Sequence, residues 1–270
     1  MAAWLGRAVS MLVVGAFALA LLAPLGGTLL FALATRWVVT VLPEGWTLDA
    51  VATTLGHPRF TETLARSLGL AAAAVALDAL LVVPALTALM LARPRWQVVF
   101  DVATVVPFAL PGVVVALGLV RFYGWAWPDA LHTPWLLAAA HAAGGLPIMY
   151  WAVAANLRAI GVRRLYEAGM LLGARPRQLL LRVVVPNVLP GLAAGGAFVF
   201  AFSFTDFAYA NLLVGGGWPT FPVWQATMML LDGHVMAVLS LLSFAVLWLT
   251  THVMARWAQR RQLWLAGRAL

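Results

Sequence analysis

Residues 164–186 read RLYEAGMLLGARPRQLLLRVVVP. Apolar residues in the first part recur at spacings of three and four, which predicts a short helix over 164–172. Gly173 is expected to end this helix, because glycine adopts the left-handed conformation after a helix at no steric cost. Pro176 suits the first turn of a second helix. Two prolines, Pro186 and Pro190, are expected to break that second helix before the next apolar run.

This segment is predicted to form a helix–glycine–helix elbow at a membrane surface. Residues 157–187 contain six arginines, so they are too polar to cross a bilayer and too long for a simple turn. Such an elbow can pass force between a partner protein and the membrane spans on either side. The alternative is an amphipathic linker that only rests on lipid headgroups.

Long apolar runs lie on both sides of the elbow and along the rest of the chain. Of 270 residues, 64% are hydrophobic and 10% are charged, whereas a soluble domain has about 45–50% and about 25%. This composition excludes a soluble globular or disordered protein and predicts an all-α polytopic membrane bundle. A span needs about 20 residues, and six spans are expected, over 9–34, 67–92, 98–120, 134–156, 188–210 and 235–255.

The arginines predict how the chain is oriented. With the N-terminus inside, 13 of the 17 arginines fall in inner segments and 4 in outer ones. Positive loops stay in the cytoplasm, so both termini and the elbow are expected there. In the first outer loop, Thr47 or Asp49 could cap a short surface helix.

The chain has neither lysine nor cysteine, which excludes several kinds of chemistry. A phosphate-binding P-loop needs its lysine, so any ATP that drives this protein must bind another chain. Disulfides, thiolate metal sites and a cysteine nucleophile are excluded as well. The five histidines lack metal-ligand spacing, so neither a metal nor another cofactor is expected. The net charge of +8 fits topology and anionic membrane lipid rather than nucleic acid.

The elbow resembles the cytoplasmic EAA motif of ABC importer permeases, which reads Glu-Ala-Ala, three residues, Gly, nine residues and Ile-x-Leu-Pro. Here Glu167, Ala168 and Gly169 are followed after three residues by Gly173, and after nine more by VVVP at 183–186. The spacing is the same throughout. The departures are Gly169 in place of the second alanine and two valines in place of Ile and Leu. Gly169 is expected to loosen the first helix by about 1 kcal/mol relative to alanine.

The resemblance implies the permease subunit of a type I, binding-protein-dependent ABC importer, a multi-pass protein of the bacterial inner membrane. It covers residues 62–256, with 1–61 as a first helix and outer loop and 257–270 as a cytoplasmic tail. In this family the elbow docks on a separate ATP-binding cassette subunit, two identical or homologous permeases pair, and a periplasmic binding protein delivers the substrate. The chain itself is then not an enzyme. By motif position, the coupling interface comprises Glu167, Ala168, Gly169, Gly173 and Pro186.

Polar side chains at membrane depth are candidates for a translocation path, because burying them in lipid is costly and they usually face the bundle interior. Asp206 follows the fifth apolar run, and its alternative role is an acid that emerges into water. Asp78 lies within the second run, and its alternative role is a structural hydrogen bond to another helix. The path candidates are Asp78, Ser203, Asp206 and Asn211.

Two further expectations concern the ends of the bundle. Asp101 lies near Arg93 and Arg95, which predicts a surface ion pair at the inner end. The glycines at 215–217 have no strand before them, so they indicate an outer loop rather than a phosphate loop. Residues 220–230 are expected to form a short helix that closes the cavity.

The substrate class is suggested by residues 199–223, with their SFTDF and LVGGG segments. This stretch is more similar to permeases for polyamines, iron(III) and 2-aminoethylphosphonate than to those for sugars. Asp206 would suit a cationic or zwitterionic ligand. The alternative function is an ion-coupled secondary transporter. Such transporters usually have broken helices and repeated halves; prolines in the third run suggest a break, but the chain shows no matching second half.

Overall fold

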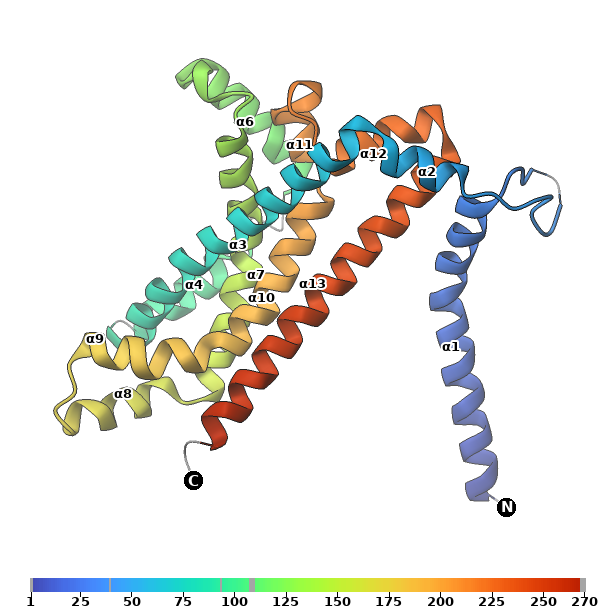
Figure 1. Ribbon diagram of the computed structural model, residues 1–270. Coiled ribbons are helices and arrows are strands. Elements are labelled where there is room, and N and C mark those ends of the chain that lie inside the picture. Colours follow the sequence, from blue (N-terminus) through green and yellow to red (C-terminus); the bar gives the residue numbers. More distant parts are fainter. Residues whose placement is uncertain (1, 39, 93, 107–109, 268–270) are drawn as a thin grey trace. The chain divides into compact units, whose positions relative to one another are not determined.

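The computed structural model describes residues 2–38, 40–92, 94–106 and 110–267 (Figure 1). Apart from one isolated bridge between Ala34 and Trp46, these residues form helices, turns and irregular loops. The predicted all-α polytopic membrane fold is therefore confirmed. Within the described part, five helical segments are long and apolar enough to cross a membrane, namely Val9–Leu33, Pro58–Leu91, Pro134–Ala159, Pro176–Thr205 and Gly233–Arg260.

The third expected span, over 98–120, is wrong as a single helix. The structure has α4 (Gln97–Ala103) and α6 (Gly112–Ala126) there. Each of these helices is too short to cross a bilayer, since a span needs about 20 residues. Pro111 is the N-cap residue of α6, and its ψ of 135° lies outside the helical region. Proline disfavours the helical conformation in the residue before it and lacks an N–H, so an interruption of the helix is expected here. Pro107, the other proline of this run, lies outside the described residues.

The chain divides into two compact units. Unit 1 comprises residues 1–60 and 224–246, and unit 2 comprises residues 61–223 and 247–270. Unit 1 contains α1 (Ala2–Leu33), whose described side chains from Val9 to Leu22 are exposed and largely aliphatic. This is expected of a helix that faces lipid.

Unit 1 also contains α2 (Asp49–Gly56), the short surface helix expected in the first outer loop. Its N-cap residue is Leu48, with no side-chain cap, and the Thr47 hydroxyl accepts a hydrogen bond from the Asp49 N–H at 3.1 Å. In the same unit, the His234 ring stacks on Phe31 at 4.4 Å between centroids, and its Nδ1 lies 2.7 Å from the Phe31 carbonyl oxygen. This contact joins α1 to α13 (Gly233–Gly267) within the unit.

In unit 2, three long helices lie side by side: α3 (Pro58–Ala92), α7 (Pro134–Ala159) and α10 (Val185–Thr205) (Figure 1). Glycines bring α7 and α10 close together. A Cβ on Gly191 would lie 2.9 Å from the Ala152 carbonyl oxygen, and one on Gly195 would lie 2.9 Å from the Met149 sulfur. Lipid is as apolar as the helix surfaces, so membrane helices associate through close packing rather than through the hydrophobic effect. Small residues at the contact allow the two backbones to approach closely.

The second limb of the elbow is continuous with the membrane helix that follows it, which corrects the expected break at Pro186 and Pro190. The short helix α9 (Pro176–Leu179) passes into a π-helical segment, Leu180–Val184, and then into α10, so that one helical path runs from Pro176 to Thr205. A π-helical turn is wider than an α-helical turn. The segment ends just before Pro186, where a regular turn would set the proline ring against a backbone carbonyl.

At the end of unit 2 opposite the elbow lie the short elements η2 (Pro128–Ala130), α11 (Ala208–Leu213) and η4 (Gly215–Gly217). Helix α12 (Phe221–Leu231) follows them in the chain. The expected helix over 220–230 is confirmed as α12. The fifth expected span ends earlier than predicted, at Thr205, because Asp206 has an extended backbone.

Candidate functional site

The turn of the elbow is built by Gly173. Helix α8 (Val162–Leu171) ends beside this residue. Gly173 has φ +79°, which lies in the left-handed region that favours glycine. The Ala174 N–H donates to the Gly169 carbonyl at 3.1 Å and the Gly173 N–H donates to the Met170 carbonyl at 3.0 Å. These two bonds are a Schellman motif, which satisfies carbonyls at a helix end, and the predicted end of the first helix is confirmed.

Gly169, the departure from the motif, lies where the two limbs of the elbow meet. A Cβ at this position would overlap Cδ2 of Leu179, which comes from α9 and is buried. Leu179 therefore fills the space that an alanine methyl group at position 169 would occupy. The close packing of α8 against α9 depends on glycine at 169.

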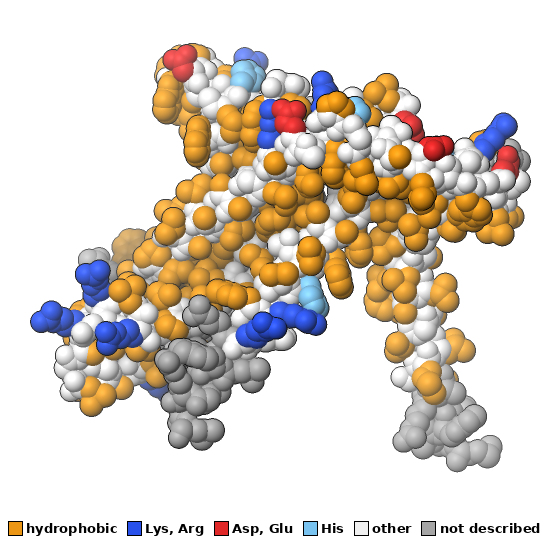
Figure 2. Space-filling model, viewed as in Figure 1, with side chains coloured by type: hydrophobic (Ala, Val, Ile, Leu, Met, Phe, Trp, Pro, Cys, Tyr) orange, Lys and Arg blue, Asp and Glu red, His pale blue; other side chains and the backbone are white. Residues whose placement is uncertain are grey.

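The remaining motif residues present a surface. Glu167 is exposed and pairs with Arg163 one turn earlier, at 2.8 Å between Oε1 and Nε. Beside the turn, Leu171 is 89% exposed and Leu172 is 88% exposed. Arginine side chains gather at this end of unit 2 (Figure 2). The elbow therefore offers an apolar tip within a basic surround, while Pro186 lies at the start of α10, away from the tip.

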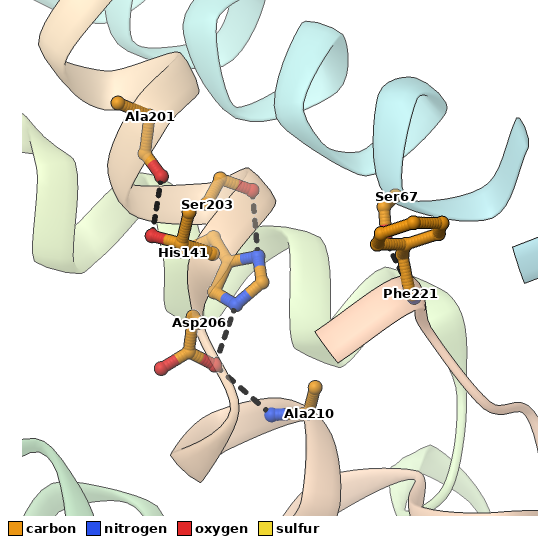
Figure 3. A network of polar contacts seen from close by, with 8 residues as sticks. Ser67, His141, Ala201, Ser203, Asp206, Ala210 and Phe221 are labelled. Carbon is orange, nitrogen blue, oxygen red and sulfur yellow. Dashed lines mark hydrogen bonds and ion pairs between the residues drawn. The ribbon is translucent and has the colours of Figure 1, made fainter. Parts of the chain in front are cut away.

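Two of the path candidates meet through a histidine that the sequence analysis did not select. His141 of α7 places Nε2 3.1 Å from Oδ2 of Asp206, and its Nδ1 lies 2.8 Å from the Ser203 hydroxyl (Figure 3). His141 is 1% exposed and the Asp206 side chain 9%. Oδ2 of Asp206 also accepts the Ala210 N–H at 3.1 Å. The Asp206 side chain is thus largely buried and hydrogen-bonded within the protein, just beyond the end of α10.

The hydrogen bonds define what this network can do. A carboxylate only accepts, so Nε2 of His141 is the donor to Asp206, and in that tautomer Nδ1 accepts from the Ser203 hydroxyl. The same three residue types form the triad of serine hydrolases, but here Ser203 is 3% exposed. A hydroxyl so deeply buried offers no approach to a substrate. The arrangement ties α7 to α10 and to the start of α11.

The other two path candidates lie apart from this network. Asn211 is exposed and lines a cavity of about 570 Å³ with His132, Trp218 and the glycines at 215–217. Asp78 of α3 is 0% exposed, and neither of its carboxyl oxygens has a hydrogen-bond partner. A Cβ on Gly145 of α7 would lie 2.8 Å from its Oδ2. The structural hydrogen bond considered for Asp78 is not present in the part of the chain that the structure describes.

Sequence reasoning missed His141 because it looked for metal-ligand spacing. A more useful criterion would have been pairing, since an ionisable residue inside a span needs a partner on another helix. Ser203 and Asp206 lie three residues apart and could have been examined as that partner.

Asp101 forms the expected ion pair, but with a different arginine. Its carboxylate accepts both bonds from Nη2 of Arg158 in α7, at 2.8 and 3.0 Å, and a further one from the Tyr150 hydroxyl at 2.8 Å. The partners expected from the sequence were Arg93, which lies outside the described residues, and Arg95. Arg158 belongs to another helix, so its proximity to Asp101 could not be read from the local sequence.

Comparison with known proteins places these features in a family. Residues 80–263 match the sequence model of a family described as "Binding-protein-dependent transport system inner membrane component". The putrescine transport system permease protein PotI of Escherichia coli (strain K12) is 25% identical over 221 residues, which cover 78% of this chain and 73% of that protein. The inner membrane ABC transporter permease protein YdcU of the same strain is 41% identical over 68 residues, 25% of this chain and 21% of that protein.

A solved structure has the same fold. It is that of a bacterial ABC transporter involved in the import of the acidic polysaccharide alginate. The TM-score is 0.70 at 18% identity, and the alignment covers 93% of this chain and 96% of the other.

Proposed function

Because this chain belongs to the family of binding-protein-dependent transport system inner membrane components and is the permease of an ABC importer, we propose that its elbow docks on a separate ATP-binding subunit. ATP hydrolysis belongs to that subunit, and this chain is the transport component in the inner membrane. A second permease, identical or homologous, and a periplasmic binding protein complete the importer. The ion-coupled alternative finds no support in the family match.

The observation that carries the docking proposal is the exposed apolar tip of the elbow. Leu171 and Leu172 stand almost fully exposed beside a turn that Gly173 holds in a fixed conformation. Large exposed apolar patches on an element outside the lipid mark interaction sites. The absence of lysine, and hence of a P-loop, supports ATP binding by another chain.

The surround of the tip indicates the chemistry of the partner groove. Four arginines of α8, of α9 and of the turn between them are exposed here, and one of them, Arg163, is paired with Glu167. A groove that accepts the tip should be apolar at its floor and acidic at its rim, since complementary charge steers association and fixes the orientation of docking. The arginines are Arg163, Arg164, Arg175 and Arg177.

For the substrate, we propose a small cationic solute of the polyamine class. The support is the similarity to a putrescine permease over most of both chains, together with the resemblance of residues 199–223. Iron(III) and 2-aminoethylphosphonate are the other candidates. The pairing of Asp206 with His141 leaves that carboxylate engaged in this conformation, so the proposal does not use it as the cation ligand.

The docking proposal is tested by co-purification from detergent-solubilised membranes. Wild type is compared with Leu171→Asp, Leu172→Asp and Glu167→Arg. The control is Val41→Asp in the first outer loop, where an equally exposed aliphatic side chain receives the same charge. An ATP-binding subunit should accompany wild type and the control and be lost from the elbow variants. Equal recovery with all variants would show that docking does not use this surface.

A further inference from the structure

A cluster of contacts joins α4, the inner half of the broken third span, to the inner end of α7. Asp101 of α4 is held by both bonds from Arg158 and by the Tyr150 hydroxyl. One turn away, the Trp151 indole N–H donates to the Thr104 hydroxyl at 3.2 Å.

The start of α4 is held in the same way. When the Gln97 amide is assigned with its oxygen toward Arg158, the orientation that satisfies both groups, this oxygen lies 3.0 Å from Nε and 2.8 Å from Nη2 of the guanidinium and accepts from them. Arg158 is thus bound at both its Nε and Nη2 atoms by one short helix. The side chains of Arg158 and Asp101 are 51% and 37% exposed, and the further bonds to Tyr150 and Gln97 make the pair more directional than a single exposed ion pair.

Arg158 is also next to the elbow in the chain. Helix α7 ends at Ala159, only Ile160 and Gly161 follow, and α8 begins at Val162. Gly161 has φ +62°. A displacement of α8 therefore reaches Arg158 through a very short connection, and α4 is bound to Arg158 directly.

The cluster borders open space. A cavity of about 730 Å³ is lined by Gln97 and Arg158 together with Met90 of α3 and residues 159–165 of the elbow. The inner end of α7 is thus not packed solidly on this side. A contact that passes motion from one helix to another requires both space for the helices to move and a directional bond between them.

We propose that Asp101 is a positioning residue that makes α4 follow the elbow, so that the inner half of the third span moves when the ATP-binding subunit moves α8. This inference rests on the proposed function, because it requires the elbow to be docked. A broken span suits such motion, because its two halves are not one rigid helix. A break of this kind is tolerated at membrane depth where the backbone is buried in protein or lines a water-filled cavity.

The test uses the intact complex of this chain with its co-purified ATP-binding subunit, reconstituted in liposomes with its binding protein. The variants are Asp101→Asn, Arg158→Gln and the charge swap Asp101→Arg with Arg158→Asp. Glu62→Gln is the matched control, because it removes an ion pair that lies within α3 and joins no second helix. ATP hydrolysis and uptake of radiolabelled putrescine are measured together.

Each single variant should keep ATP hydrolysis but lose about fivefold or more in uptake per ATP, the lower end of common coupling strengths. The charge swap should restore coupling, and Glu62→Gln should leave it unchanged. Wild-type coupling in both single variants would overturn the inference. So would a charge swap no better than the single variants, because coupling would then not depend on the ion pair between these two positions.

A second readout does not depend on the substrate. The chain contains no cysteine, so Val98→Cys, on the exposed side of α4, can be labelled alone with an impermeant maleimide. ATP with vanadate should change its labelling rate, and the change should vanish in Asp101→Asn and return in the charge swap. Persistence of the change in Asp101→Asn would overturn the inference. Failure of wild type to recover an ATP-binding subunit would instead overturn the proposed function.

Discussion

Leu179 of α9 occupies the space where residue 169 of α8 would carry a methyl group. The two limbs of the elbow therefore touch at a backbone surface rather than through two side chains. The family motif has alanine where this chain has Gly169, and the space of that alanine's methyl group is filled by the Leu179 side chain. The elbow is consequently one packed body, and its shape depends on a pair of positions ten residues apart.

Gly169→Ala should destabilise the elbow even though alanine favours a helix by about 1 kcal/mol. Overpacking against buried Leu179 costs about 1–3 kcal/mol, so the net effect is a lower melting temperature in detergent. Adding Leu179→Val should recover part of the loss. Gly118→Ala in α6 is the control: nothing lies within 4 Å of its added Cβ, so it should keep or raise stability. A gain from Gly169→Ala itself would contradict the packing.

At Gly173 the backbone conformation predicts an order of tolerance. The φ of this residue is +79°. Such a left-handed conformation costs an ordinary residue about 1–2 kcal/mol, and it costs asparagine less. Recovery of the ATP-binding subunit should therefore fall from wild type through Gly173→Asn and Gly173→Ala to Gly173→Val. The measurement is quantitative co-purification at equal amounts of permease, and equal recovery across the series would mean that docking tolerates a disordered turn.

His141→Ala should lower the melting temperature more than Ser203→Ala does. Loss of the imidazole leaves two buried groups without their partner, and each unsatisfied group costs about 1–3 kcal/mol. Ser203→Ala removes one hydrogen bond and leaves the His141–Asp206 pair in place. Thermal unfolding of the purified permease checks the order. Unchanged melting temperatures with lost uptake would instead support a role for this network in the translocation path.

Asp78→Thr should stabilise the bundle by about 1–3 kcal/mol, because a buried carboxyl without a partner is unfavourable. Threonine has a similar volume and can satisfy its hydroxyl within its own helix. Thr87 of the same helix does this by donating to the Val83 carbonyl at 2.7 Å. Thermal unfolding and uptake are measured together. Retained uptake with higher stability would remove Asp78 from the path, whereas lost uptake would keep it there.

The elbow was predictable because its determinants are local. Gly173 and Pro176 set helix boundaries through their own backbone preferences, and both act as the sequence indicates. The continuation through Pro186 was not predictable, because a π-helical segment depends on how the whole helix is held. The pairs His141–Asp206 and Asp101–Arg158 were missed for a related reason. Each joins two helices, and apolar periodicity gives no information about which polar residues of different spans lie at the same depth.

The unbroken helical path from Pro176 to Thr205 has a mechanical consequence. It contains 30 residues. At about 1.5 Å per residue it is a rod about 45 Å long. A tilt of about 5° about the Pro176 end would displace the Thr205 end by about 4 Å. Next to the Thr205 end, Asp206 accepts the hydrogen bond from His141. Because the second limb of the elbow and α10 form one helix, a tilt of that limb would be carried past the glycine contacts on α7 to the opposite face of the membrane.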